Sequence, residues 1–376
     1  MTDAPYRLLG ADVSYYTAKI RAFLLQKRLP FVDVLATRDV FRDEIVPRVG
    51  WPVIPVMTTP EGDAWQDTSD MVDALEARHP APPLVPLSPL RRFAALLFEL
   101  YADEWIKVPA LHFRWHYDRE FAVREFGRNN DPARTPEEQR RVGEKIAAPF
   151  AAWPVALGAT AASIPAIEAN YFALLAALDT HFAAWPFLFG DTPTLADCAL
   201  YGPFHAHLFR DPVSGSFMRA SAPGVCAWIV RMQQPQPLTD ACADPHDRSD
   251  TLPATLLPAW RLLSCDYVPI LVAQLTAFQG WLGTHPDAEI PRTFGTHTVT
   301  IGRGTPFARE VPRALFSYDQ WMWQRAKDAF DTIPVPDLRR VLTWLEAIGA
   351  RALVEVPLPI RVRRSAFRLV RAPMDC

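Results

Sequence analysis

The sequence predicts an α/β domain, an all-helical domain and a third, α-rich part. Strand and helix patterns alternate over the first 80 residues, whereas helical patterns fill residues 90–232. Two proline clusters, Pro80–Pro89 and Pro235–Pro258, separate these parts. Proline accounts for 37 of the 376 residues, which is roughly twice its usual ~5% share. We therefore expect an α/β domain over 1–82, a helical domain over 88–233 and an extension over 234–376.

The first domain begins with a strand, a helix and a second strand. A helix this short between two strands implies a parallel pair with a right-handed crossover. A third strand then pairs with a fourth across the turn Pro60-Glu61-Gly62-Asp63, and a helix follows. The expected strands are Tyr6–Leu9, Phe31–Val34, Val53–Met57 and Ala64-Trp65, and the expected helices are Thr17–Lys27 and Ser69–Arg78.

The helical domain has one strong start signal. Thr194 and Asp197 form a variant of the capping box, with Asp in place of the usual Glu or Gln. The helices expected here are Arg91–Arg119, Glu137–Ile146, Pro165–Ala184, Cys198–Leu208 and Ala222–Met232. In the extension we expect helices at Trp260–Leu282, Tyr318–Phe330 and Asp337–Ile348, and a possible β-hairpin of His297–Ile301 with Phe307–Val311 across Gly302-Arg303-Gly304.

Composition and charge exclude several classes of function. The net charge of −3, from 39 basic and 42 acidic residues, gives no reason to expect a nucleic-acid partner. The first residues lack a basic segment followed by an apolar run, so we expect no signal peptide and a cytoplasmic protein. No stretch approaches about 18 apolar residues without charges, so we expect no membrane partner.

The cysteines indicate neither a disulfide framework nor a zinc site. They are odd in number, scattered and without CxxC spacing, which favours reduced thiols. The five are Cys198, Cys226, Cys242, Cys265 and Cys376.

The most informative stretch is Trp51–Met57, an apolar strand interrupted by proline. A proline inside a strand removes a ladder donor and belongs at an edge or a bulge. If the Ile54-Pro55 bond is cis, the main chain of Ile54 turns outward and can pair with an extended peptide, as an added strand would. A trans edge-strand proline is the commoner alternative.

Asp67-Thr68 stands where the following helix is expected to begin. Main-chain N–H groups at a helix N-terminus attract carboxylates, and the Thr68 hydroxyl adds a donor there. Asp67 offers a carboxylate to a ligand amine. The alternative is that either residue simply caps the helix.

Ser14-Tyr15-Tyr16 lies between the first strand and the first helix. A hydroxyl beside a helix N-terminus can donate to a thiolate. Lowering a thiol pKa from about 8.5 by one to two units takes about 1.4–2.7 kcal/mol, and one hydrogen bond to a charged group supplies roughly 1.5–3 kcal/mol. One hydroxyl is therefore sufficient to lower the pKa of a thiol by this amount. Alternatively, Ser14 is an N-cap of the helix, and one residue can have both roles.

Taken together, these motifs resemble the soluble, cytosolic glutathione transferase superfamily over about residues 5–233. The family's Ser-or-Cys catalytic loop with a following Lys falls on Ser14 and Lys19, and its cis-proline falls on Pro55. Its acid–hydroxyl pair, usually Glu-Ser, falls on Asp67-Thr68. Further matches are the capping box from Thr194 to Asp197 and the closing pattern of Pro223, Trp228, Arg231 and Met232.

The resemblance implies a thioredoxin-like first domain and an enzyme that joins the glutathione thiolate to an electrophilic small molecule. It assigns thiolate stabilisation to Ser14, with Tyr15 second and Tyr16 third, because family members that use a tyrosine carry it at the end of the first strand, earlier than Tyr15 and Tyr16. The position of Tyr15 itself is often proline in the family. It assigns glutathione binding to Ile54, Pro55, Asp67 and Thr68, and the electrophile pocket to Tyr101 and Trp105. Glutathione is then a co-substrate, no metal is required, and a homodimer is expected.

Two other functions remain open on the same fold. One is a non-catalytic glutathione-binding or scaffold protein, since the long extension could cover the pocket or the dimer face. The other is a glutathione-dependent reductase, isomerase or dehalogenase, although Ser14 cannot form the mixed disulfide of a thiol reductase.

Two weaker signals complete the sequence. His112 and His116 stand four residues apart without an evident third ligand, so a metal site is not expected. The basic tail could meet an acidic partner, but a solvated surface is the simpler interpretation; its arginines are Arg361, Arg363, Arg364, Arg368 and Arg371.

Overall fold

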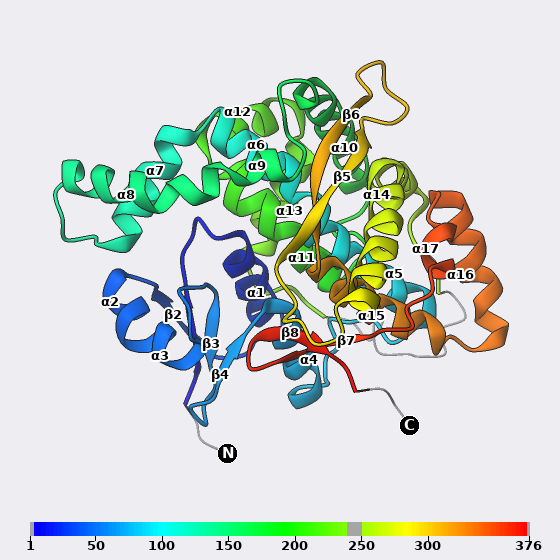
Figure 1. Ribbon diagram of the computed structural model, residues 1–376, viewed down its shortest axis with the longest axis horizontal. Coiled ribbons are helices and arrows are strands. Elements are labelled where there is room, and N and C mark those ends of the chain that lie inside the picture. Colours follow the sequence, from blue (N-terminus) through cyan, green and yellow to red (C-terminus); the bar gives the residue numbers. More distant parts are fainter. Residues whose placement is uncertain (1–3, 239–249, 374–376) are drawn as a thin grey trace.

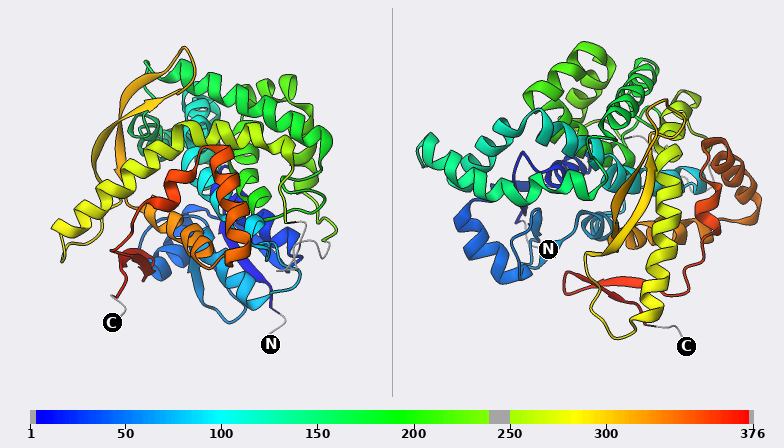
Figure 2. Two further views of the ribbon diagram at one scale, coloured as in Figure 1. Left: turned by 90° about the vertical axis from the view of Figure 1, so that its right-hand side faces the viewer. Right: turned by 45° about the horizontal axis from the view of Figure 1, so that its top comes forward.

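The computed structural model describes residues 4–238 and 250–373 (Figure 1). A small sheet domain at the N-terminus lies beside a helical domain, and the extension packs along one side of both (Figures 1 and 2). The middle of the Pro235–Pro258 boundary, together with Cys242 and Cys376, lies outside the described residues. The three domain boundaries stay a prediction.

The N-terminal domain is built on a four-stranded mixed sheet in the order β2-β1-β3-β4. The β1–β2 pair is parallel, as expected, whereas β3 runs antiparallel to β1 and to β4. The third strand begins at Val56, not at Val53, because Pro52 and Pro55 have no N–H for the ladder. The elements are β1 Tyr6–Gly10, β2 Phe31–Leu35, β3 Val56–Thr58, β4 Ala64–Gln66, α1 Tyr15–Gln26 and α4 Thr68–Arg78.

One helical segment of this domain was not predicted. It connects β2 to β3 and consists of α2 Arg38–Val40, the π-helical η1 Phe41–Ile45 and α3 Val46–Val49. Its ends do carry signals: Thr37 accepts a hydrogen bond from Val40 N at 3.3 Å, and Gly50 adopts φ +92 at the C-cap.

The second domain is helical over the whole predicted range. The long aromatic run is divided into α5, η2 and α6, and helices α7 and α8 form a hairpin that projects from the domain (Figure 1). Its elements are α5 Pro89–Leu100, η2 Tyr101–Trp105, α6 Lys107–His116, α7 Arg119–Asn130, α8 Pro136–Ala151, α9 Trp153–Ala156, α10 Ile164–Ala184, α11 Leu195–Pro203, η3 Phe204–Phe209, α12 Pro212–Ser221 and α13 Pro223–Met232.

The predicted capping box is confirmed at the start of α11. The Asp197 carboxylate accepts hydrogen bonds from Thr194 N at 3.0 Å and Leu188 N at 2.9 Å. It also accepts one from Trp228 Nε1 at 3.1 Å. The box therefore ties the start of α11 to α13 as well as capping the helix.

The extension consists of helices around two hairpins. The predicted β-hairpin is confirmed as β5–β6 and is longer than expected. Its turn is fixed by Asp266 of α14, which accepts hydrogen bonds from Gly302 N and Arg303 N, both at 2.7 Å. The elements are η5 Ala254–Leu256, α14 Leu257–Thr284, β5 Thr293–Ile301, β6 Arg309–Phe316, α15 Tyr318–Asp331, α16 Val335–Ile348, α17 Arg351–Glu355, β7 Val362–Ser365 and β8 Arg368–Arg371.

One helical segment of the extension, Ala254–Thr284, is long and apolar enough to cross a membrane. Of its most apolar window, 56% is buried inside the structure. A core helix meets the same criteria of length and composition, and here the buried face packs on the helical domain.

One hydrophobic core joins the three parts of the chain. It contains Leu8 of the sheet, Phe98 of α5 and Trp323 of α15. The Phe98 ring meets Trp260 of α14 at a centroid distance of 5.0 Å. Because all these side chains are buried, the extension is an integral part of the fold.

Candidate functional site at one edge of the N-terminal sheet

Strand order brings the predicted site residues to one edge of the sheet. Leu9 of β1 stands opposite Val56 of β3, and Val56 stands opposite Gln66 of β4. Because β3 is antiparallel to both neighbours, the end of β1, the start of β3 and the end of β4 meet there. Ser14 follows β1, Ile54-Pro55 precedes β3, and Asp67-Thr68 follows β4.

The Ile54-Pro55 segment, called here the peptide clamp, has the cis conformation that the sequence analysis considered. The Ile54-Pro55 bond is cis. The β3 ladder starts at Val56, so the main chain of Ile54 lies outside the sheet pairing. This main chain is positioned where an extended peptide could add to it.

Asp67 caps α4 and has an unusual backbone. Its φ of +82 and ψ of 127 lie outside the regions that non-glycine residues favour. One carboxylate oxygen, Oδ1, accepts hydrogen bonds from Ser69 N at 2.9 Å and Asp70 N at 3.3 Å. Such strained residues cost about 1–3 kcal/mol and gather at ligand sites. Thr68 is buried as the first residue of the helix.

Ser14 is the N-cap of α1. Its Oγ accepts a hydrogen bond from Thr17 N at 3.2 Å. Because this bond uses a lone pair of Oγ, the hydroxyl proton can still be donated to a thiolate. The capping role is therefore present, and the catalytic role stays a prediction compatible with it.

Tyr15 and Tyr16 both contact the helical domain. The Tyr15 hydroxyl donates to the carbonyls of Ala102 at 2.9 Å and Asp103 at 2.7 Å, and the Tyr16 hydroxyl donates to Asp103 O at 3.2 Å. Burial raises the pKa of both phenols well above their usual value. With their protons engaged, both are weaker candidates than Ser14 for donating to a thiolate.

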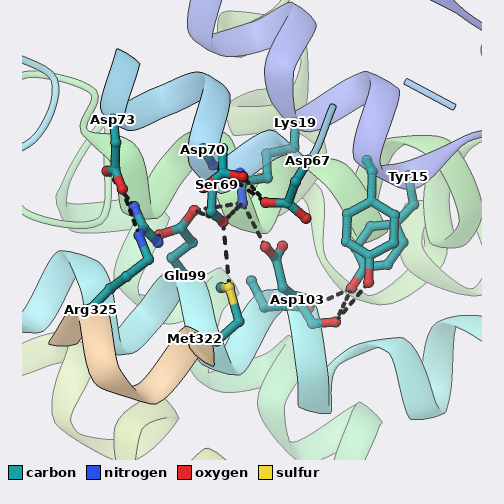
Figure 3. A network of polar contacts seen from close by, with 12 residues as sticks. Tyr15, Lys19, Asp67, Ser69, Asp70, Asp73, Glu99, Asp103, Met322 and Arg325 are labelled. Carbon is teal, nitrogen blue, oxygen red and sulfur yellow. Dashed lines mark hydrogen bonds and ion pairs between the residues drawn. The ribbon is translucent and has the colours of Figure 1, made fainter. Parts of the chain in front are cut away.

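Lys19 is at the centre of a buried charge network (Figure 3). Its Nζ contacts Glu99 Oε1 at 2.6 Å and Asp103 Oδ2 at 2.5 Å, and it donates to Ser69 Oγ at 3.2 Å. The Lys19 side chain is 0% exposed. The network therefore connects α1, α4 and the helical domain directly behind the predicted site.

The two carboxylates of the network have different pKa values. Burial raises the pKa of Asp103 to about 6, despite the nearby Lys19 ammonium. Burial also acts on Glu99, but Arg325 and Lys19 outweigh it and lower the pKa of Glu99 to about 2. The difference arises because Arg325 of α15 pairs with Glu99 (2.5 Å) and not with Asp103.

The extension brings three further residues to this edge, and the sequence did not single them out for the site. The Tyr318 hydroxyl donates to Asp67 Oδ2. Arg364 pairs with Asp70 at 2.6 Å. Phe367 packs against a cluster that includes Trp51 and Ile54. Arg364 therefore has its acidic partner within the chain and is not on a solvated surface, whereas Arg363 and Arg368 are exposed, as expected.

Tyr101 and Trp105 are both buried against α14, and Trp105, unlike Tyr101, lines a small cavity between α6, α10 and α14. The Tyr101 hydroxyl is 3.1 Å from Ser264 Oγ of α14. The Trp105 ring stacks on Tyr267 at 5.4 Å. Helix α14 thus covers the side on which we expected an electrophile pocket, and the assignment of these two residues to that pocket stays a prediction.

Residues 4–238 and 250–373 contain no group of three or more His, Cys, Asp or Glu side chains placed to hold a metal ion. His112 and His116 stack at 5.1 Å, and His112 Nε2 is 2.9 Å from Glu168 Oε1. This pair is explained by ring stacking and an ionic hydrogen bond.

A thioredoxin-like mixed sheet domain followed by a helical domain defines the class of the protein. Residues 8–83 match the family model of the glutathione S-transferase N-terminal domain, and residues 161–231 match that of the C-terminal domain. The two matches follow one another in the order that the resemblance implied.

The chain is also similar to solved structures. One is a glutathione S-transferase from Methylobacterium radiotolerans in complex with glutathione sulfonate (23% identity, 66% of this chain and 98% of that chain, TM-score 0.39). Another is the β-etherase LigF from Sphingobium sp. (17%, 65% and 100%, TM-score 0.44). A third is FzlA from C. crescentus (15%, 67% and 97%, TM-score 0.38). No curated protein matches the chain.

Proposed function

We propose that the protein binds glutathione at this edge of the sheet and joins its thiolate to an electrophilic small molecule. The Ile54 main chain holds the cysteinyl unit, Asp67 and Thr68 hold the γ-glutamyl group, and Ser14 donates to the thiolate. The observation that carries the proposal is the backbone of Asp67. Its φ is positive, which is unusual for a non-glycine residue, and its own carboxylate caps the start of α4 at the sheet edge that also holds Ile54-Pro55.

The chemistry needs little more than these groups. A thiolate is the nucleophile, and at neutral pH an ordinary thiol is mostly protonated. A hydrogen bond from Ser14, which stands at the N-terminus of α1, favours the thiolate by the amount estimated from the sequence. The thiol proton passes to solvent, and the thiolate lone pair then forms a carbon–sulfur bond. At the same time the electrophilic carbon releases a leaving group with its bonding electrons or, in an addition, gives the π electrons of its double bond to a neighbouring atom that takes up a proton. The glutathione sulfur ends as a thioether.

The test is thiol conjugation with a panel of electrophiles, measured for the wild type and for Ser14→Ala. We expect kcat/KM to fall about 10-fold or more, since a hydrogen bond to a charged group is lost. Ser14→Ala also removes an N-cap, so Thr135→Ala, which removes the N-cap of α8 in the helical domain, is the matched control. Full activity in Ser14→Ala would exclude Ser14 from the mechanism.

A non-catalytic glutathione-binding protein is the second candidate. The favouring observation is that α14 packs against Tyr101 and Trp105, on the side where an electrophile pocket was expected. Retention on immobilised glutathione with no activity towards any electrophile would favour this candidate, and absence of retention would indicate a scaffold.

We further propose a homodimer located in the cytoplasm. The dimer rests on the family resemblance and would pair the N-terminal domain of one subunit with the helical domain of the other. The cytoplasmic location rests on the cysteine pattern, which favours reduced thiols.

A further inference from the structure

The β7–β8 hairpin of the extension lies beside the predicted γ-glutamyl end of the site (Figure 1). Arg364 of β7 donates from Nε to Asp70 Oδ2 at 2.6 Å and from Nη2 to Gln66 Oε1 at 2.5 Å. Gln66 and Asp70 stand on either side of Asp67-Thr68. A side chain that is 294 residues from Asp70 in the sequence therefore contacts this segment.

One end of the Arg364 guanidinium remains available. A guanidinium has five N–H donors in a planar fork. Nε and Nη2 are used as described, whereas Nη1 has no hydrogen-bond partner within the described parts of the chain. Among the described residues, some buried polar atoms lack a hydrogen-bond partner, and Nη1 is not one of them. Nη1 therefore reaches solvent. Arg364 is therefore held in place by two of its nitrogens and presents the third.

The charges around Nη1 suit a zwitterion. The carboxylates of Asp67 and Asp70 lie beside the guanidinium, and the positive end of α4 begins at Thr68. An amino-acid head group carries an ammonium and a carboxylate on one carbon. Acidic groups for the ammonium and a guanidinium for the carboxylate are thus present within the same small area.

The hairpin is positioned by packing as well as by charge. Ala366 and Phe367 form a tight turn, with φ of +45 and +63. The Phe367 ring meets Trp51 edge-on at a centroid distance of 6.5 Å. In addition, Tyr318 of α15 donates to Asp67. The extension therefore contacts the site through two separate elements.

We propose that Arg364 of the C-terminal extension binds the α-carboxylate of the γ-glutamyl group, so that the extension completes the binding site of its own chain. The planar guanidinium can be held by Asp70 and Gln66 through two nitrogens while it donates to the carboxylate from the third, which the single nitrogen of a lysine could not do in the same fixed geometry. This inference rests on the proposed function, because it assigns a further ligand contact to the same site.

The test compares two ligands on matched variants by titration calorimetry. The ligands are glutathione and γ-aminobutyryl-cysteinyl-glycine, which retains the amine but lacks the α-carboxylate. The variants are Arg364→Ala, Arg364→Lys and the control Arg363→Ala, which removes an exposed arginine from the neighbouring position. The ratio of the two affinities within one variant is unaffected by a partial loss of folded protein.

We expect the wild type and Arg363→Ala to prefer glutathione over the analogue by about 10-fold to 100-fold, the range for a charge-assisted hydrogen bond. In Arg364→Ala this preference should fall to about 1, and Arg364→Lys should restore part of it. An unchanged preference in Arg364→Ala would overturn the inference. Tighter glutathione binding by Arg364→Ala would also overturn it and would show that the hairpin blocks the site. If the wild type binds neither ligand, the proposed function itself fails.

Discussion

Replacing Lys19 with methionine should destabilise the protein strongly. Lys19 and Arg325 are the two cations of a buried network whose anions are Glu99 and Asp103. The four charges balance in the wild type. Lys19→Met leaves Glu99 paired with Arg325 but leaves Asp103 without a cation. Breaking a buried ion pair from one side costs about 3–5 kcal/mol, a large fraction of the 5–15 kcal/mol that is typical of folded proteins.

The loss of stability in Lys19→Met should depend on pH in a defined direction. With Lys19 present the pKa of Asp103 is about 6, and removal of the ammonium raises that pKa further. At pH values below about 6 the carboxyl is then neutral and no longer needs a cation. The destabilisation should therefore be largest near pH 8 and should shrink towards pH 5.

The assay is urea unfolding followed by circular dichroism, with the first transition compared between the wild type and Lys19→Met at the two pH values. Lys145→Met is the control, because Lys145 is an exposed lysine on α8. A change below about 1 kcal/mol for Lys19→Met, equal to that of the control, would refute the ionic account of this network.

Two other predictions concern the site and the assembly. Burial and the neighbouring Asp67 raise the pKa of Asp70 from 3.8 to about 6 despite Arg364. The folded protein therefore keeps this proton where the unfolded chain has lost it, so the contribution of Asp70 to stability decreases as the pH rises through that window. The melting temperature of Asp70→Asn relative to the wild type should thus increase between about pH 4 and pH 6.5, and a constant difference would contradict this. Light scattering at micromolar concentration should give the mass of two chains, and the mass of one chain would refute the dimer.

Most elements of the fold could be predicted because their signals are local. Apolar periodicity predicted the helix that the structure shows as α4. The spacing of Thr194 and Asp197 predicted the capping box at the start of α11. The helical segment at 38–49 was missed because it is short and contains a π-helical turn, which breaks the regular spacing of its apolar residues.

The N-terminal part of the site could also be predicted in outline. Ser14, Ile54 and Asp67 each follow or precede a strand, and strand order alone brings them to one edge. The contacts of Arg364 with Asp70 and of Tyr318 with Asp67 could not be predicted. They depend on how α15 and the β7–β8 hairpin pack, and the basic residues of the tail show no local pattern that distinguishes Arg364 from its neighbour Arg363.

The central claim is that glutathione binds between the sheet edge and the extension. A crystal structure of the protein soaked with glutathione tests it most directly. The account predicts the cysteinyl main chain paired with Ile54, the thiol within hydrogen-bond distance of Ser14 Oγ, and the γ-glutamyl carboxylate on Arg364 Nη1. Glutathione bound elsewhere, or this edge occupied by the hairpin alone at saturating glutathione, would contradict it.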